Sequence, residues 1–356
     1  MARIIGAPDQ YIQGPGEINK LHEYGSQLGN QFLVVAEDQT MTMVHDLMER
    51  VFRETESVLI YEEFSGVCTG PEIDRLSTVC DLSSCNVVLG IGGGRAINAA
   101  RAVAAMHRLP LIVVPTTAAT GAPCSRISII TDNDGTFQEF RTYPHHPDIV
   151  IVDSALIAQA PTRSLVAGMG NTIATWLGAQ ARRRNDTDNL IGGKGTLSSY
   201  TLAQLGYETV LADGLRALIA SQNQLPTSAF EHVLEASIYC AGMAFENSGC
   251  AAAHSVGNAL TILPEARSQS YGELAAFGSI VQLVLEDAPR QEMDDVMNLF
   301  LSTGLPMTLD EIGLGDIDRE SLMKVAETAC STANFMSVMP FDVTPSDVFA
   351  ALLAAN

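Results

Sequence analysis

Residues 87–98 read Val-Val-Leu-Gly-Ile-Gly-Gly-Gly-Arg-Ala-Ile-Asn, a short apolar run followed by three glycines and a helical pattern. The apolar run is typical of a parallel strand that is covered on both faces. Gly92, Gly93 and Gly94 free the backbone to turn sharply and to approach a ligand closely. Because a helix N-terminus exposes unpaired N–H groups and the positive end of its dipole, the unit predicts a pyrophosphate-binding turn. The alternative is a tight turn between strand and helix that binds no ligand. The spacing of the glycines also differs from the G-x-G-x-x-G fingerprint of ordinary dinucleotide-binding folds.

Composition argues against several classes of protein. The chain has 356 residues, 47% of them hydrophobic and 17% charged, which is typical of a globular protein of one or two domains. Its formal net charge of −21 argues against non-specific binding to nucleic acid or to an anionic membrane. No apolar run approaches the ~20 residues of a membrane span, and the first residues lack the apolar region of a signal peptide. We therefore expect a cytoplasmic protein, and the seven scattered cysteines fit buried thiols in a reducing compartment.

The order of the apolar segments predicts two domains. Residues 1–160 alternate between strand and helix patterns, which favours a parallel sheet that binds a nucleotide. The expected strands are 32–36, 57–61, 87–91, 111–115 and 148–153, with a hairpin over 126–143, and the expected helices are 41–52, 70–80 and one from 95. After residue 160 the periodicity is helical, with helices expected at 162–183, 196–220, 226–247, 249–260, 272–286, 290–303, 318–329 and 345–354. The predicted fold is an α/β dinucleotide-binding domain over 1–160 and a helical domain over 161–356, with the active site in the cleft between them.

Polar residues follow two of the predicted strands. Glu37 and Asp38 come directly after the strand 32–36, where a carboxylate can bind the ribose hydroxyls of NAD and would repel the extra phosphate of NADP. A solvated acidic loop is the alternative interpretation. Residues 116–125, Thr-Thr-Ala-Ala-Thr-Gly-Ala-Pro-Cys-Ser, follow the strand 111–115 and are small and polar. Ligands gather at this end of the strands in open α/β sheets, so the segment is a second candidate for the binding site.

The chain resembles the glycerol dehydrogenase family, a branch of the iron/zinc-dependent polyol dehydrogenases related in fold to dehydroquinate synthase. The resemblance spans nearly the whole chain and lies in co-linear motifs. These are Gly90-Ile-Gly-Gly-Gly94, Val114-Pro-Thr116, Ala122-Pro-Cys-Ser125, Pro147-Asp-Ile-Val-Ile-Val-Asp153, Ala167-Gly-Met-Gly170 with Ala174-Thr175, Ala251-Ala-Ala-His254 with Asn258, and Ala276-Phe-Gly278 with Val281-Gln-Leu-Val-Leu285. The resemblance implies NAD-dependent oxidation of a vicinal diol, with a zinc ion that binds the substrate oxygens.

The chain departs from the family pattern at the positions of the zinc ligands. Asn171 stands where the family has an aspartate, His254 is retained, and Tyr271 stands where a third ligand, a histidine, is usual. The other departures are Gly121 for a loop aspartate, Gly257 for a second histidine, Arg95 for a lysine, Asn98 for an aspartate and Leu274 for a lysine. A catalytic zinc takes about three anionic or imidazole ligands from the protein, and one histidine with a neutral amide and a phenol does not supply them. We therefore expect no catalytic zinc and no metal ligands in the family sense.

The sequence favours an NAD-dependent oxidoreductase, similar to glycerol dehydrogenase, that acts without metal on a small polyol, hydroxy or carbonyl compound. His254 and Tyr271 are the candidate acid–base groups, and Asn171 is a candidate hydrogen-bond partner of a substrate hydroxyl. The candidate cofactor-binding residues are Gly92, Gly93, Gly94, Glu37, Asp38, Asn98, Thr116, Ser125 and Ile127. An NAD-using lyase, isomerase or cyclase on the same scaffold and a non-catalytic nucleotide-binding paralogue are the alternatives. The apolar helices of the second half, together with the family resemblance, suggest a homo-oligomer.

Overall fold

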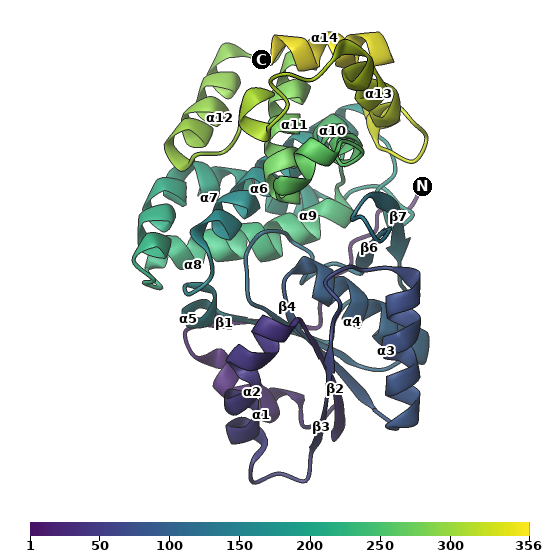
Figure 1. Cartoon of the computed structure of the whole chain (residues 1–356). Coiled ribbons are helices and arrows are strands. Elements are labelled where there is room, and N and C mark those ends of the chain that lie inside the picture. The colour runs from purple at the N-terminus through teal and green to yellow at the C-terminus, as the bar shows by residue number, and fades with distance from the viewer. Residues whose placement is uncertain (356) are drawn as a thin grey trace.

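A six-stranded parallel sheet forms the N-terminal half of the computed structural model, which describes residues 1–355 (Figure 1). Its strands are β1 (Gln10–Gly14), β2 (Gln31–Ala36), β3 (Val58–Glu63), β4 (Val87–Gly92), β5 (Leu111–Pro115) and β8 (Ile149–Asp153). They lie in the order β3-β2-β4-β5-β8-β1, and each neighbouring pair is parallel. The parallel sheet predicted from the sequence is confirmed.

Helices cover both faces of this sheet, which explains why its inner strands are apolar throughout. Leu33 and Val35 of β2 pack on the side of α3 (Gly70–Leu82) and α4 (Gly94–His107). Phe32 and Val34, one residue out of phase, pack with α1 (Leu21–Gly25) and α2 (Asp38–Phe52) on the opposite side. A short 3₁₀ turn, Glu17–Lys20, precedes α1. The alternation follows from the two-residue period of a strand.

The sequence-based prediction missed the edge strand β1. Its residues, Gln-Tyr-Ile-Gln-Gly, pair in parallel with β8, so that Gln10 lies opposite Ile149. Because an edge strand is covered less completely, four of its residues are half-buried and one is exposed, and it lacks the apolar run used to recognise the others. The predicted hairpin is confirmed as the antiparallel pair β6 (Ile127–Thr131) and β7 (Phe137–Thr142).

The C-terminal half is helical, as predicted. Its α-helices are α5 (Ser154–Ile157), α6 (Thr162–Asn185), α7 (Leu197–Gln222), α8 (Ser228–Glu235), α9 (Ala241–Asn247), α10 (Ala252–Leu260), α11 (Tyr271–Leu285), α12 (Arg290–Thr303), α13 (Arg319–Ala329) and α14 (Pro345–Ala354). Short 3₁₀ turns lie at Pro264–Ser268, Asp310–Ile312 and Met336–Val338. No helix within residues 1–355 is long and apolar enough to cross a membrane.

One predicted helix contains a π-helical turn that the sequence did not indicate, and one predicted helix boundary was wrong. The single helix expected at 226–247 is divided into α8, a π-helical turn over Ala236–Cys240, and α9. The helix expected from residue 249 begins at Ala252, because Gly249 has a φ of +107° and cannot continue a right-handed helix. A π-helical turn changes the facing of the residues that follow it, and such turns are frequent near functional sites.

The first residues of the chain lie against the helical half. The backbone N–H of Ile4 donates to the carbonyl of Lys194 at 3.1 Å. Asn247 of α9 makes two hydrogen bonds with the backbone of Gly6, at 2.8 and 3.0 Å. The amino-terminal segment therefore ties the two halves together before the sheet begins. The domain boundary at residue 160 stays a prediction, as does self-association, although α7 exposes Leu215 and Ile219.

The loop after β5, residues 116–125, is wedged between α6 and α9. A Cβ atom added at Gly168 of α6 would overlap the carbonyl of Ala118, and one added at Gly242 of α9 would lie 2.5 Å from the carbonyl oxygen of Gly121. The loop backbone thus touches both helices where they carry no side chain. This close approach joins the carboxyl end of the sheet to the helical half.

We predict that Gly242→Ala destabilises the protein by about 2–3 kcal/mol, because the new methyl group forces the loop backbone away. The matched control is Gly70→Ala in α3, where an added Cβ meets nothing within 4 Å, and which should keep or slightly raise stability. Chemical denaturation of both variants measures the difference. Equal stabilities would mean that the contact with Gly121 is not a tight constraint.

Candidate active site

The glycine turn lies where the strand order of the sheet reverses. Strand β3 lies at one edge of the sheet, beside β2, and the next strand along the chain, β4, pairs with the other side of β2. From β4 the chain continues through β5 toward the opposite edge, so β2 and β4 flank the switch point. In open α/β sheets, ligands bind in the crevice at the carboxyl ends of such strands. Gly92 ends β4 with a φ of +149°, which favours glycine, and Gly93 caps α4. The predicted strand–turn–helix is confirmed.

The other predicted polar segments reach the same edge of the sheet. Glu37 is the N-cap of α2 directly after β2, where it is half-buried, and the neighbouring Asp38 is exposed. The backbone N–H of Thr116 donates to the carbonyl of Gly92 at 3.0 Å. The loop also closes over the turn, because a Cβ atom on Gly94 would lie 3.1 Å from the Thr120 hydroxyl. The structure therefore brings these residues together, while their contact with a cofactor stays a prediction.

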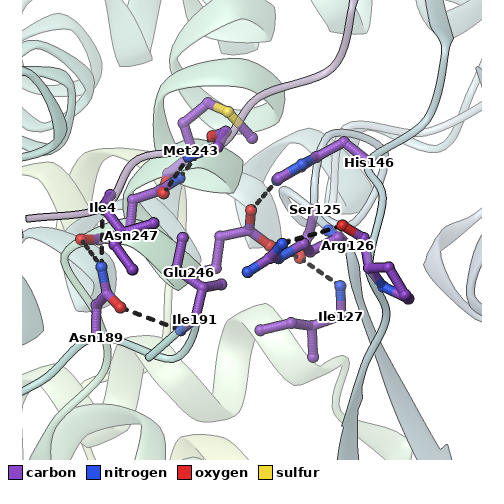
Figure 2. A network of polar contacts seen from close by, with 12 residues as sticks. Ile4, Ser125, Arg126, Ile127, His146, Asn189, Ile191, Met243, Glu246 and Asn247 are labelled. Atoms are coloured by element: carbon purple, nitrogen blue, oxygen red, sulfur yellow. Dashed lines mark hydrogen bonds and ion pairs between the residues drawn. The ribbon is translucent and has the colours of Figure 1, made fainter. Parts of the chain in front are cut away.

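The remaining predicted cofactor residues, Asn98, Ser125 and Ile127, accept hydrogen bonds from or donate them to two buried charged side chains, those of Arg101 and Glu246. The hydroxyl of Ser125 donates to Glu246 at 2.7 Å, and the N–H of Ile127 donates to that hydroxyl oxygen at 3.0 Å (Figure 2). The side-chain oxygen of Asn98 accepts from Arg101 at 2.9 Å. Sequence reasoning missed Arg101 and Glu246, because the pattern around each is that of an ordinary amphipathic helix.

The predicted catalytic residues lie on three helices of the helical half that pack against one another. Asn171 lies on α6, His254 on α10, and Tyr271 is the first residue of α11. The helices approach closely through small residues: a Cβ atom on Gly170 would lie 2.7 Å from the carbonyl oxygen of Gly272. The ring centroids of His254 and Tyr271 are 6.4 Å apart. The structure therefore brings His254 and Tyr271 together, while the grouping of Asn171 with them and the catalytic roles stay predictions.

His254, Tyr271 and Asn258 present buried polar atoms that have no partner within the described part of the chain. His254 is 0% exposed, and neither of its ring nitrogens is hydrogen bonded. Tyr271 is half-buried as a residue, but its hydroxyl oxygen is enclosed and unpartnered. The side-chain oxygen of Asn258, one turn beyond His254 on α10, is also unpartnered. Buried polar groups in folded proteins are nearly always satisfied, so this cluster is the strongest sign of a ligand site.

Burial keeps the ionisable groups of the cluster uncharged. Desolvation, with a smaller effect of the Arg182 guanidinium, lowers the pKa of His254 from its ordinary 6.5 to about 3. Burial raises the pKa of the Tyr271 phenol well above its ordinary value of 10. At neutral pH the site therefore offers a neutral imidazole and a neutral phenol. Both can donate a hydrogen bond, and neither carries charge.

Aromatic rings line the cluster on the side of the hairpin. The ring of Phe245 meets that of His254 edge-on, with centroids 5.6 Å apart. Phe140 of β7 lies 6.0 Å from Phe245 and 5.1 Å from Phe335. The hairpin, although it belongs to the N-terminal half, therefore contacts the wall of the site. Sequence reasoning missed this wall, because its residues come from three distant segments.

The donor set does not fit a catalytic zinc or iron ion. Within residues 1–355 there is no group of three or more His, Cys, Asp or Glu side chains placed to hold a metal. The aspartate that the family carries in the loop could not be accommodated at Gly121 with this backbone, because a Cβ atom there would overlap Gly242. Of Asn171, His254 and Tyr271, which stand at the family's zinc-ligand positions, His254 alone is a usual zinc ligand.

Two surface hollows of about 420 Å³ each lie elsewhere, and Phe341–Val343 contribute to the lining of both. Neither is lined by Asn171, His254 or Tyr271. Both are open depressions formed by the C-terminal segments. The unpartnered polar atoms, rather than the size of a hollow, therefore locate the candidate active site.

Comparison with known proteins shows which family the chain belongs to. Residues 8–154 match the model of the family described as iron-containing alcohol dehydrogenase. The glycerol dehydrogenase of Escherichia coli O6:H1 is 40% identical over 356 residues, covering 100% of this chain and 97% of its own length. The chain belongs to the iron-containing alcohol dehydrogenase family. It is an oxidoreductase of the glycerol dehydrogenase-like type.

Two further proteins are similar to this chain over nearly its whole length. The glycolaldehyde reductase of Halobacterium salinarum is 36% identical over 360 positions, covering 100% of this chain and 98% of its own. The crystal structure of a probable glycerol dehydrogenase from Sinorhizobium meliloti 1021 superposes with a TM-score of 0.94 at 35% identity, covering 99% and 98% of the two chains. The fold expected from the family resemblance is confirmed over the whole length.

We predict that His254 makes the stability of the free protein fall as the pH drops below 6.5. The unfolded chain then binds a proton that the folded chain, with a His254 pKa of about 3, does not bind. Each pH unit in this interval costs up to about 1.4 kcal/mol, so the protein loses about 2–3 kcal/mol from this group between pH 6.5 and 4.5.

Denaturation of wild type and His254→Asn at several pH values measures this difference. The substitution also changes packing, which shifts stability by a constant amount at every pH. Only the pH-dependent part tests the prediction, and it should be smaller in the variant. Parallel curves would mean that His254 is not enclosed as described.

Proposed function

We propose that this chain is an NAD(H)-dependent oxidoreductase that interconverts a small carbonyl compound and its alcohol without a catalytic metal. The observation that carries the proposal is the cluster of unpartnered polar atoms on His254 and Tyr271, buried in the helical half. Leaving buried donors and acceptors unpaired costs about 1–3 kcal/mol for each group. A substrate oxygen that hydrogen bonds to them would remove this cost.

The uncharged state of the site favours hydrogen-bond donation to an oxygen that becomes negative. NADH, when bound, supplies the hydride, so that carbonyl compound, NADH and a proton give alcohol and NAD⁺. In this proposal the Tyr271 hydroxyl donates to the carbonyl oxygen and passes its proton to the developing alkoxide. The neutral imidazole of His254 orients the same oxygen or a neighbouring hydroxyl. Asn171 supplies a further amide on the adjoining helix.

The proposed cofactor site is the switch point of the sheet. The turn Gly92–Gly94 exposes the N-terminus of α4, which suits a pyrophosphate. Glu37, the N-cap residue of α2 directly after β2, would bind the ribose hydroxyls in this proposal, which would favour NAD(H) over NADP(H). The identity to a glycolaldehyde reductase and to glycerol dehydrogenases supports substrates with small, hydroxyl-bearing carbon chains.

The test measures NADH oxidation with a panel of aldehydes, ketones, diols and hydroxy acids. We expect turnover of small hydroxy-aldehydes or ketones by the wild type and a loss of at least about a hundredfold in kcat for Tyr271→Phe. The matched control is Tyr61→Phe, which removes a surface hydroxyl bonded to Glu49 and should keep full activity. NADH binding without turnover of any compound would instead support a non-catalytic nucleotide-binding protein.

The pH profile should separate the two directions of reaction. Reduction needs Tyr271 protonated, and because burial raises the pKa of this phenol well above 10, the reduction rate should not fall between about pH 6 and 9. In the oxidation direction the deprotonated Tyr271 accepts the proton of the alcohol. The oxidation rate should therefore rise with pH over this range, together with the deprotonated fraction of the phenol. A reduction rate that declines with an apparent pKa near 7 would assign the proton to another group.

Metal analysis tests the remaining part of the proposal. We expect the purified protein to contain far less than one zinc or iron per chain and to keep its activity after treatment with a chelator. The basis is the donor set of one imidazole, one amide and one phenol. Stoichiometric metal whose removal abolishes activity would overturn the metal-free mechanism and leave the oxidoreductase assignment in place.

A further inference from the structure

The segment Ala122–Ile127 is held on one side by a buried cation. Arg101 of α4 is 1% exposed. Its guanidinium donates to the carbonyl oxygens of Ala122 and of Ile127, the latter at 3.0 Å. The same group donates to Asn98 at 2.9 Å. Because α4 begins in the glycine turn, Arg101 fixes the segment relative to the proposed pyrophosphate site.

A buried anion holds the same segment from the opposite side. Glu246 of α9 is 0% exposed. One of its oxygens accepts from the Ser125 hydroxyl at 2.7 Å and from the backbone N–H of Arg126 at 2.9 Å. Its other oxygen contacts the ring nitrogen of His146, in the chain that leads into β8 (Figure 2). Three hydrogen bonds thus satisfy the carboxylate, all with partners from the N-terminal half.

Helix α9 touches both halves of the proposed active site through consecutive residues. Glu246 holds the segment 122–127, and the preceding residue, Phe245, contacts the ring of His254. The helix is also fixed at Gly242 against the loop backbone and at Asn247 against Gly6. A displacement of α9 would therefore move His254 together with the segment 122–127, which we call the cofactor segment because it contains the proposed cofactor-binding residues Ser125 and Ile127.

We propose that Glu246 is a positioning residue, which keeps Ser125–Ile127 in the conformation that binds NAD(H) and in register with His254. This inference rests on the proposed function, since it assigns Ser125 and Ile127 to the cofactor site. The buried charge is expensive to desolvate, and charge-assisted hydrogen bonds are directional and strong. A carboxylate with one backbone and two side-chain partners fixes a loop more strictly than an apolar contact does.

The test compares Glu246→Gln with Glu231→Gln. Glutamine keeps the size of the side chain but offers one acceptor oxygen in place of two. Glu231 of α8 is the matched control: it also accepts hydrogen bonds from the N-terminal half, from Gln13 at 2.6 Å and from Ser154, and neither of these partners belongs to the segment 122–127. Both variants replace a carboxylate at a contact between the halves by a neutral amide, which is a weaker acceptor. Only Glu246→Gln weakens the hydrogen bonds to the segment 122–127.

We expect Glu246→Gln to raise the KM and Kd for NADH by about tenfold and Glu231→Gln to change them by less than twofold. In a Ser125→Ala background, Glu246→Gln should have a smaller additional effect, because the two residues act through one contact. Equal weakening of NADH binding by both glutamate variants, or wild-type binding by Glu246→Gln, would overturn the inference.

Amide hydrogen exchange provides a readout that does not need NADH. The backbone amides of residues 124–127 should exchange faster in Glu246→Gln than in wild type, with no such change in Glu231→Gln. If the wild type fails to bind NADH, the proposed function fails, and the exchange data still decide whether Glu246 fixes the segment. Unchanged exchange in Glu246→Gln would overturn the positioning role even if NADH binds.

Discussion

The contact between the backbones of Gly121 and Gly242 is the constraint on which the proposed site depends. It leaves no room for a side chain, so the loop after β5 and helix α9 approach as closely as two backbones can. The loop then lies over the glycine turn, with Thr120 beside Gly94, while α9 is brought to the carboxyl end of the sheet. The helical half is in this way joined to the strand ends at which ligands bind in this class of fold.

The site carries costs that a purely structural core would avoid. His254 and Tyr271 bury polar atoms that the described residues leave unpaired, and Arg101 and Glu246 bury opposite charges that satisfy the same short segment from two sides. Folded chains accumulate such costs mainly where function requires them. Helix α9 carries Glu246 and, one residue earlier, Phe245, which contacts the ring of His254, so the buried charges and the unpartnered imidazole are linked through one helix.

The sequence predicted the elements whose residues carry a local pattern. The strand before Gly92 is apolar on both faces, and the helix after it follows from its spacing. The edge strand β1 lacks that pattern, since its side chains are mostly half-buried. Glu246 and Ser125 are 121 positions apart, and nothing in either neighbourhood indicates that the carboxylate is buried. Contacts of this kind depend on how the two halves pack, and the aromatic wall from Phe140 to Phe245 was missed for the same reason.

A metal-free site makes greater demands on position than a metal site. A zinc ion attracts an oxygen from a range of directions, whereas a hydrogen bond weakens steeply when donor and acceptor are misaligned. If Tyr271 and His254 replace the ion, a small shift of the substrate oxygen relative to the phenol would cost much of the stabilisation. The cofactor segment must then stay in register with His254, and the residues that enforce this register, Glu246 above all, become part of how the reaction is controlled.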